Sequence, residues 1–313
     1  MIAAFAPATV SNVACGFDVL GFALDTPGDV VVAEAATGSG VDIIAIEGDH
    51  GRLSRDSSRN TAAAGVDALL TRLGAHRAIH LTIHKGIPLA SGVGSSGASA
   101  VAAVVAANEL LGRPASLDVL FECAMQAEMV GCGAAHPDNV APALYGGFVL
   151  ARAGAMPDGS SDIIRLPVPE GLSCAVLRPH LEVHTGEARA LLGDAVPLRA
   201  AVRQWGNVGG LVAGLFLNDL PLIARTLEDH VAEPKRAHLV PGFARVKDAA
   251  HAAGALGCSL SGSGPSMFAL CASLERAELV GEAMRAAFAQ QETAGADLWV
   301  SPVGRRGARI VAA

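Results

Sequence analysis

Short apolar or alternating runs in the first 85 residues predict strands, and longer stretches with helical spacing follow them. DVVVAEA, VDIIAIEG and AIHLTIHKG are rich in β-branched residues and either alternate or run apolar, as strands do. Apolar positions recur at helical spacing over residues 60–74, where Gly74 can end the helix. Residues 95–111 and 117–130 predict two further helices with the same spacing.

The second half continues this mixture of strands and helices. FVLARA, SCAVLRP and DLWVSPV predict strands, whereas GCGAAHPDNVAPALYGG looks irregular. Helices are expected near residues 198–218, 219–231 and 242–256 and from about Leu274. Strands separated by helices in both halves predict two α/β or α+β layers rather than a helix bundle or a β-sandwich. The loop-like stretch GAMPDGSSD then divides the chain into domains of residues 1–155 and 163–313.

Composition narrows the class of protein without identifying a function. The 313 residues are 51% hydrophobic and 17% charged, which is typical of a folded chain long enough to bury a core. The net charge of -7, with no clustered basic face, argues against nucleic acid as a partner. Six scattered cysteines without a CxxC pair, no signal peptide and no apolar run of membrane-spanning length predict a cytoplasmic protein that does not bind membranes.

The stretch PLASGVGSSGAS, residues 88–99, is the first candidate for chemistry. Gly92, Gly94 and Gly97 match G-x-G-x-x-G, but the loop lies far along the chain, and the acidic residue about 20 positions later, Asp118, starts a helix. A Walker A loop is excluded because no Gly-Lys-Ser/Thr follows. A phosphate-binding loop of another kind is therefore favoured over a plain glycine turn. Backbone amides and the start of the next helix would hold the phosphates, with a bound cation in place of the lysine.

Two other stretches strengthen this interpretation. APATVSNVACGFDVLGFALD lies near the N-terminus, and SLSGSGPSMFAL forms a second glycine-rich loop late in the chain. Together with the first loop, they resemble the three signature motifs of the GHMP kinases, in the same order. GFDVLGFALD, HPDNVAP and EPKRAHLVPGF resemble the homoserine kinase family within that group more than its sugar-kinase or mevalonate-kinase members. The resemblance covers nearly all of the chain.

The resemblance implies an α+β fold of two parts. The N-terminal half would be similar to the second domain of ribosomal protein S5, and the C-terminal half would be ferredoxin-like. The ligands would then bind in a cleft between the two halves. The loop at residues 261–266 would approach the nucleotide loop from the other domain and close over the active site. The alternative is a tight hairpin between two strands of the second domain, and the two roles are compatible.

The resemblance also implies a set of residues for ATP and Mg²⁺. Ser96 and Glu128 would hold the metal ion, which suits a hard cation with few protein ligands. Asn60 and Lys85 would lie near the base of the nucleotide. The remaining nucleotide-binding residues form one continuous loop: Pro88, Leu89, Ala90, Ser91, Gly92, Val93, Gly94, Ser95, Ser96, Gly97 and Ala98.

The acceptor implied by the resemblance is L-homoserine, a zwitterion with a hydroxyl at its far end. Arg189 and Arg236 match the family positions that pair with its carboxylate, for which guanidinium groups are well suited. Asn12 and Asp18 would accept from its ammonium group. The complete set of acceptor-binding residues is Asn12, Asp18, His136, Asn139, Thr185, Arg189, Arg236 and Gly262.

The mechanism implied for this family departs from that of many GHMP kinases, in which an aspartate acts as general base. The corresponding position here carries Asn139, with Asp138 beside it, and an amide cannot take a proton at neutral pH. We therefore expect direct in-line phosphoryl transfer, with Asn139, Ser96 and Glu128 as the catalytic residues. A loose transition state depends mainly on alignment and charge neutralisation, so a base is not required.

Three other functions are compatible with parts of the pattern. The protein could be a GHMP kinase for another small alcohol, such as mevalonate or shikimate, or a non-catalytic sensor with the same fold. A dinucleotide-binding oxidoreductase follows from G-x-G-x-x-G alone. A homodimer is compatible with the sequence but is not indicated by it.

Overall fold

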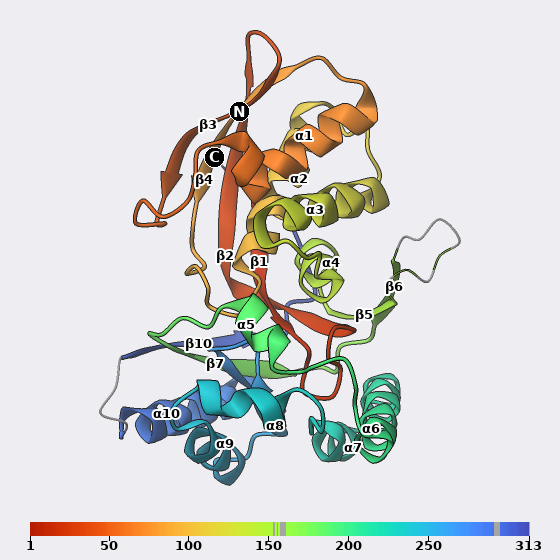
Figure 1. Ribbon diagram of the computed structural model, residues 1–313, viewed down its shortest axis with the longest axis vertical. Helices are drawn as coiled ribbons and strands as arrows, with labels where there is room; N and C mark the ends of the chain where they lie inside the picture. The colour runs from red at the N-terminus through yellow and green to blue at the C-terminus, as the bar shows by residue number, and fades with distance from the viewer. Residues whose placement is uncertain (153, 155, 157–160, 291–294, 313) are drawn as a thin grey trace.

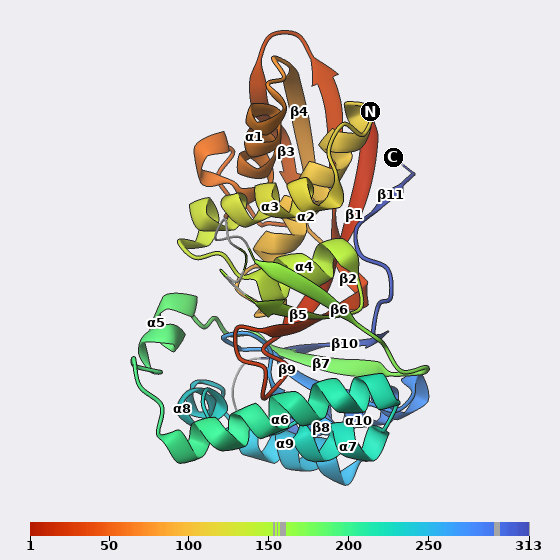
Figure 2. The same cartoon turned by 90° about the vertical axis from the view of Figure 1, so that its right-hand side faces the viewer.

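The computed structural model describes residues 1–152, 154, 156, 161–290 and 295–312, and it consists of two α+β halves stacked end to end (Figure 1). Each half is built on one β-sheet. Figure 2 shows that the helices of the first half gather on one side of the first sheet, whereas most helices of the second half pack below the second sheet.

The first half contains a sheet of seven strands among the described residues, in the order β11-β1-β2-β4-β3, with β5 paired to β2 and β6 to β5. Its longest strand, β2, pairs antiparallel with β1, β4 and β5, so it forms the centre of the sheet. The strands are β1 (Ile2–Ser11), β2 (Leu20–Ala36), β3 (Gly40–Glu47), β4 (Ala78–His84), β5 (Phe148–Arg152), β6 (Asp162–Leu166) and β11 (Arg309–Val311). The helices are η1 (Ser57–Arg59), α1 (Thr61–Leu73), α2 (Ser95–Leu110), α3 (Leu117–Cys132) and α4 (Pro137–Tyr145).

The second half contains a four-stranded antiparallel sheet in the order β10-β7-β9-β8. In chain order this is 4-1-3-2, with helices between the first and second strands and between the third and fourth, which is the ferredoxin-like arrangement predicted for this half. The strands are β7 (Ser173–Pro179), β8 (Gly257–Leu260), β9 (Met267–Cys271) and β10 (Ala296–Pro302). The helices are α5 (Thr185–Ala190), α6 (Leu198–Leu217), α7 (Leu220–Thr226), α8 (Glu233–Arg236), η2 (Ala237–Leu239), α9 (Phe243–Ala252) and α10 (Leu274–Ala289).

Helix α2 is the central helix of the first half because its sequence has small apolar residues on every side. Most of its side chains are buried, from Ser95 to Asn108, which agrees with the lack of a polar face in SSGASAVAAVVAANEL. Alanine and valine allow α1, α3 and the sheet to pack closely around it. The start of α2 is thereby fixed at the boundary between the two halves.

Most predicted elements are present, but two predictions about helices are wrong. The stretch GCGAAHPDNVAPALYGG is not irregular throughout, because residues 137–145 form α4 despite Pro142 inside the helix. Pro137 occupies the first turn, where its missing N–H costs nothing, and Gly146 ends the helix. The helix expected over residues 219–231 ends at Thr226, and the following backbone N–H groups of Val231 and Ala232 donate to Asp229 instead.

The two sheets do not divide the chain as the sequence suggested. Strand β6 opens the predicted second domain, residues 163–313, yet it pairs with β5 in the first sheet. The last strand, β11, returns to pair with β1, so the C-terminus lies near the N-terminus (Figure 2). Most of the predicted boundary loop GAMPDGSSD lies outside the described residues.

The late glycine loop connects the two halves, in addition to joining β8 to β9. Ser261 Oγ donates to the carbonyl of Gly92 over 2.7 Å, and Ser266 Oγ donates to the carbonyl of Ser91 over 2.5 Å. The loop is therefore both a tight connection between two strands and a direct contact with the first glycine loop, as predicted, whereas its role as a cover of the site stays a prediction.

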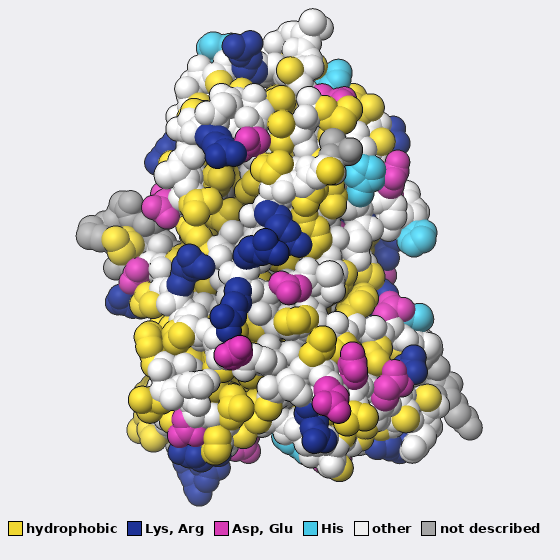
Figure 3. Space-filling model, turned by 180° about the vertical axis from the view of Figure 1, so that it is seen from behind, with side chains coloured by type: hydrophobic (Ala, Val, Ile, Leu, Met, Phe, Trp, Pro, Cys, Tyr) yellow, Lys and Arg dark blue, Asp and Glu magenta, His cyan; other side chains and the backbone are white. Residues whose placement is uncertain are grey.

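The face opposite to the view of Figure 1 is mixed in character. A small group of Lys and Arg side chains near its centre is surrounded by hydrophobic, acidic and uncharged ones (Figure 3).

Across the part of the chain that the structure describes, no helix combines the length and the hydrophobicity needed to cross a bilayer.

The contact between the two glycine loops yields a prediction about stability. Gly92 has φ of 78°, and a Cβ there would lie 2.6 Å from the carbonyl oxygen of Gly264 and 2.8 Å from that of Ser261. Gly112 also has positive φ, but open space surrounds it. Gly112→Ala should therefore cost about 1–2 kcal/mol from backbone strain alone, and Gly92→Ala should cost about 1–3 kcal/mol more.

Urea unfolding of the two variants beside the unmodified protein measures this difference. Equal losses for Gly92→Ala and Gly112→Ala would show that the contact between the loops is not tightly packed.

Candidate active site

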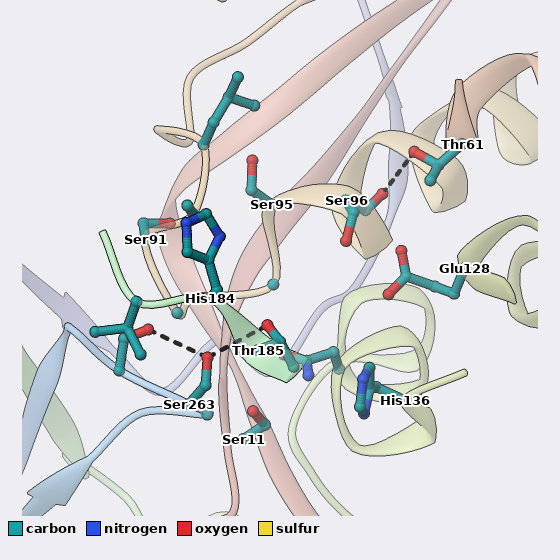
Figure 4. A pocket seen from close by; sticks show the side chains of 18 of the residues that line it. Ser11, Thr61, Ser91, Ser95, Ser96, Glu128, His136, His184, Thr185 and Ser263 are labelled. Atoms are coloured by element: carbon teal, nitrogen blue, oxygen red, sulfur yellow. Dashed lines mark hydrogen bonds between the residues drawn. The ribbon is translucent and has the colours of Figure 1, made fainter. Parts of the chain in front are cut away.

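A cavity of about 550 Å³ is lined by residues of both halves, including Thr185, Gly186 and Arg189 of α5. Figures 1 and 2 show α5 at the level where the two halves meet. The walls of the cavity come from the N-terminal loop, the first glycine loop, α3 and α4, and from the α5 region and late loop of the other half. Figure 4 shows Ser95, Ser96 and Glu128 on the first half, across the cavity from Thr185 and Ser263 on the second. Residues far apart in the sequence thus surround one space.

The first glycine loop leads directly into α2 and exposes the start of that helix to the cavity. Gly92 and Gly94 have φ of 78° and 70°, which glycine adopts without strain, and Gly94 is the N-cap of α2. No side chain caps the helix at Gly94, so its first N–H groups remain available to a ligand. Because Gly92, Gly94, Ser95 and Ser96 line the cavity, the helix dipole favours an anion there.

Lys85 lies beneath this helix start. Its side chain is only 2% exposed, forms an ion pair with Asp29, and donates to the carbonyl of Ser95 and the hydroxyl of Ser99. Burial lowers the pKa of Lys85, while Asp29 acts in the opposite direction. Asn60, also at the cavity wall, caps α1 through Ala62 N and donates to Ser54 O. That Asn60 and Lys85 also lie near the base of the nucleotide stays a prediction.

Ser96 and Glu128 face one another across a corner of the cavity (Figure 4). Glu128 is 2% exposed, and its Oε1 has no hydrogen-bond partner among the described residues. Burial raises the pKa of Glu128 to about 7, against the lowering effects of its hydrogen bond with Ser96 and of the Lys85 charge. An unpaired buried carboxylate oxygen beside a serine hydroxyl fits a divalent cation that takes its other ligands from phosphate and water.

The second half of the protein contributes two guanidinium groups to the cavity. Arg189 pairs with both carboxylate oxygens of Asp18, over 2.8 and 2.9 Å. Arg236 is 3% exposed and donates to the backbone carbonyls of Ala188 and Gly262. The ring of Phe17 lies 5.6 Å from the Arg189 guanidinium and 5.2 Å from that of Arg236, so it brings the two cations together.

The N-terminal loop that carries Asp18 has an unusual backbone. Asn12, Val13, Ala14 and Asp18 all have positive φ, which costs energy in residues other than glycine. The Asn12 side chain supports this turn, since its Oδ1 accepts from Asp18 N and its Nδ2 donates to the carbonyl of Gly262. Two of these four residues, Asn12 and Asp18, line the cavity.

Helix α4 presents three polar residues to the same space. Asp138 is 2% exposed, and its Oδ2 accepts from Asn12 N, whereas its Oδ1 has no partner in the described structure. Burial, reinforced by the negative charge of Asp18, raises the pKa of Asp138 to about 7. Asn139 Oδ1 accepts from the hydroxyl of Thr9, and burial lowers the pKa of His136, which favours its neutral form.

Comparison with known proteins agrees with this geometry. The family model for the GHMP kinases N terminal domain matches residues 60–147, and the model for the GHMP kinases C terminal matches residues 211–290. The homoserine kinase of Chlorobium phaeovibrioides is 50% identical over 318 residues, which cover 98% of each chain. The homoserine kinase of Xanthomonas campestris is 40% identical over 311 residues, covering 99% of this chain and 94% of its own. The chain belongs to the homoserine kinase family of the GHMP kinases.

Solved structures agree with this assignment. The crystal structure of homoserine kinase from Cytophaga hutchinsonii has a TM-score of 0.94 and 50% identity, over 99% of this chain and 97% of that one. L. major mevalonate kinase in complex with R-mevalonate has a TM-score of 0.70 at 15% identity, over 96% of this chain and 95% of that one, which is a likeness of fold alone. The predicted family and the predicted fold class are confirmed.

The structure of this GHMP kinase brings together every site residue that the sequence suggested on the acceptor side. Asn12, Asp18, Thr185, Arg189 and Arg236 line the cavity, as do His136, Asn139 and Gly262. In the nucleotide loop, Pro88, Val93, Gly97 and Ala98 are not among the residues that line it. Val93 and Ala98 are fully buried, so the part of this loop that faces the cavity comprises Leu89–Gly92 and Gly94–Ser96.

Sequence reasoning missed three residues of this GHMP kinase that support the site. Thr9, Phe17 and Asp29 occur in or beside stretches that were already of interest, but nothing in the sequence assigned them a partner. Thr9 and Asn139 are 130 positions apart, and Asp29 and Lys85 are 56 apart. Of the three, only Asp29 gave a signal in the sequence. It is an acidic residue within a strand, β2, and a buried acidic residue requires a partner.

The buried carboxyl of Glu128 predicts a pH-dependent cost to stability when no Mg²⁺ is present. Because the pKa is higher in the folded protein, the contribution of this group to stability falls as the pH rises from about 4.5 to about 7. Gln is neutral throughout. Relative to the unmodified protein, Glu128→Gln should therefore gain up to about 3 kcal/mol of stability between pH 5 and pH 8, at ~1.4 kcal/mol per pKa unit.

Thermal unfolding in the presence of a chelator tests this expectation. Glu122→Gln is the matched control, since Glu122 lies on the same helix but its side chain is 36% exposed and paired with Arg72. A difference between Glu128→Gln and the unmodified protein that stays constant from pH 5 to pH 8 would contradict the argument.

Proposed function

We propose that this protein transfers the γ-phosphoryl group of ATP to the side-chain hydroxyl of L-homoserine, giving O-phospho-L-homoserine and ADP for threonine biosynthesis. The observation that carries the proposal is the combination of groups that line the cavity. The first half contributes the start of α2 and its glycine loop, and the second half contributes Arg189 and Arg236, with Asp18 paired to Arg189. A phosphate chain suits the start of α2, and an amino-acid zwitterion suits the two guanidinium groups and the carboxylate.

At the nucleotide end, the amides at the start of α2 and the loop residues around Gly92 would hold the phosphates of ATP. The positive φ of Gly92 and Gly94 turns this backbone toward the cavity, and the helix dipole adds to the attraction. Lys85 supports the loop through its hydrogen bond to the carbonyl of Ser95, so its positive charge acts beneath the start of α2.

Ser96 and Glu128 would hold Mg²⁺, which neutralises charge on the phosphates when it is bound. The described residues contain no group of three or more His, Cys, Asp or Glu side chains arranged for a metal ion. A two-residue site is consistent with Mg²⁺, because that ion keeps several waters and takes oxygen ligands from the nucleotide. The unpaired Oε1 of Glu128 supports this assignment.

At the acceptor end, the homoserine carboxylate would lie between Arg189 and Arg236, while the ammonium group would bind Asp18 and the side chain of Asn12. Thr185 and Gly262 would complete this wall from the second half of the protein. In the structure Asp18 already pairs with Arg189, so the zwitterion would replace one ion pair by two of the same kind. His136 would face the middle of the substrate as a neutral imidazole.

The hydroxyl oxygen of homoserine would attack the γ-phosphorus in line with the departing oxygen of ADP. Asn139, on the first turn of α4, would orient this hydroxyl, and the start of α2 would stabilise the transferred group. Since the transition state is loose, alignment contributes more than removal of the hydroxyl proton.

Location and assembly stay predictions. A cytoplasmic enzyme is expected from the sequence, and a homodimer is compatible with it. The feature that supports a dimer is the face of α6, where large apolar side chains are 54–71% exposed. These side chains are Leu198, Val202, Trp205, Phe216 and Leu217.

ADP release with L-homoserine as acceptor tests the proposed function, with mevalonate and shikimate as the rival alcohols. Arg236→Leu should raise the KM for homoserine at least about 100-fold, because a charge-assisted pair with the carboxylate is lost, and should change the KM for ATP far less. Arg285→Leu, an exposed arginine on α10, is the control. Equal effects of Arg236→Leu on both KM values would indicate a nucleotide role or a folding defect.

The roles of Asn139 and Asp138 can be separated by substitution. Asn139→Leu should lower kcat by about 100-fold, because the hydroxyl loses its orienting group. Asp138→Asn should have a mild effect, since the amide oxygen can still accept from Asn12 N. Loss of activity in Asp138→Asn with intact ATP binding would make Asp138 the general base.

A further inference from the structure

A buried hydroxyl stands directly behind the residue that faces the reacting hydroxyl. Thr9 lies near the end of β1 and has no exposed surface, and its Oγ1 donates to Asn139 Oδ1 over 2.9 Å. Asn139 lines the cavity, so it separates Thr9 from any ligand. Thr9 can therefore affect the reaction only through Asn139 or through the backbone around it.

This hydrogen bond determines which end of the Asn139 amide faces the cavity. An asparagine side chain has one oxygen that accepts and one nitrogen with two hydrogens to donate. With Oδ1 held by the hydroxyl of Thr9, Nδ2 is the group left for a substrate. A hydrogen bond at this position also fixes the rotation of the amide plane, which has a broad preference when it is free.

The Thr9–Asn139 pair is packed against the phosphate loop. A Cβ on Gly94 would lie 2.1 Å from Thr9 Oγ1 and 2.9 Å from Asn139 Oδ1, so only glycine leaves room for the pair. The backbone N–H of Thr9 also donates to the carbonyl of Val93 over 3.1 Å. The amide of Asn139 is thus positioned relative to the start of α2, where the transferred group would lie.

We propose that Thr9 is a positioning residue for phosphoryl transfer: its hydroxyl holds Asn139 so that Nδ2 donates to the oxygen of the acceptor hydroxyl. This inference rests on the proposed function. In the transfer, the acceptor oxygen bonds to the γ-phosphorus, and the bond from that phosphorus to the bridging oxygen breaks with its electron pair leaving on ADP. The hydroxyl proton passes to water, because the amide nitrogen already carries its own hydrogens and cannot accept it.

Thr9→Val and Thr9→Ser test this role as a pair. Valine has nearly the same shape but no hydroxyl, so Thr9→Val should lower kcat by about 10- to 100-fold while both KM values change less than about threefold. Thr9→Ser keeps the donor and should retain kcat within about threefold of the unmodified protein. Normal kcat in Thr9→Val, or a loss in Thr9→Ser as large as that in Thr9→Val, would overturn the proposal.

A double-mutant cycle separates positioning from a general effect on the fold. In the Asn139→Leu background no amide is left to orient, so adding Thr9→Val should reduce kcat no further. If Thr9→Val instead lowers kcat by the same factor in both backgrounds, Thr9 acts through the phosphate loop and the proposal is wrong.

Two controls keep the outcome clear. Turnover of L-homoserine by the unmodified protein is measured first, and its absence would overturn the proposed function together with this inference. Full activity of both the unmodified protein and Thr9→Val would overturn only the role of Thr9. Should Thr9→Val fail to fold, as judged by thermal unfolding, Thr9→Ala removes the same hydroxyl without adding a methyl group next to Asn139 and carries the same expectations.

Discussion

The structure of the site depends on how the carbonyl groups of the first glycine loop are bound. Three consecutive carbonyls, those of Ser91, Gly92 and Val93, accept from Ser266, Ser261 and the backbone of Thr9. Because the carbonyl side of this loop is held by the protein, the amides at the start of α2 are left to the cavity. Two of the three donors come from the other half of the chain, so the contact that forms the anion site also joins the two sheets.

Two pairs of charged side chains at the cavity are already matched with one another in the absence of a ligand. Lys85 is paired with Asp29 beneath the first glycine loop, and Arg189 is paired with Asp18 at the cavity wall. Under the proposed function the exposed pair is exchanged for contacts with a zwitterion, whereas the buried pair is fixed by several hydrogen bonds. One ion pair therefore stabilises the fold, and the other lies where the proposed function would place the substrate.

Local patterns predicted much of the fold and of the site, and contacts between distant residues explain what was missed. Strands β2 to β5, β7 and β10, the helix from Ser95 and the cavity-facing glycines could be predicted because periodicity and turn chemistry are local. Helix α4 was missed because Pro142 and the flanking glycines conceal it, although neighbouring elements stabilise it. The pairing of β6 and β11 with the first sheet, like the hydrogen bond from Thr9 to Asn139, joins distant residues, and a single sequence does not reveal such partners.

The two neighbours Asp138 and Asn139 divide the tasks that one aspartate could otherwise perform. Asp138 accepts from the backbone of Asn12, where positive φ must be stabilised, and its buried carboxyl has a pKa near 7. Asp138 thus helps to stabilise the N-terminal loop, although burying its carboxylate costs free energy. Asn139, which carries no charge, lines the cavity and under the proposed function would face the reacting hydroxyl. Phosphoryl transfer through a loose transition state permits this division, because the nucleophile needs alignment more than it needs a base.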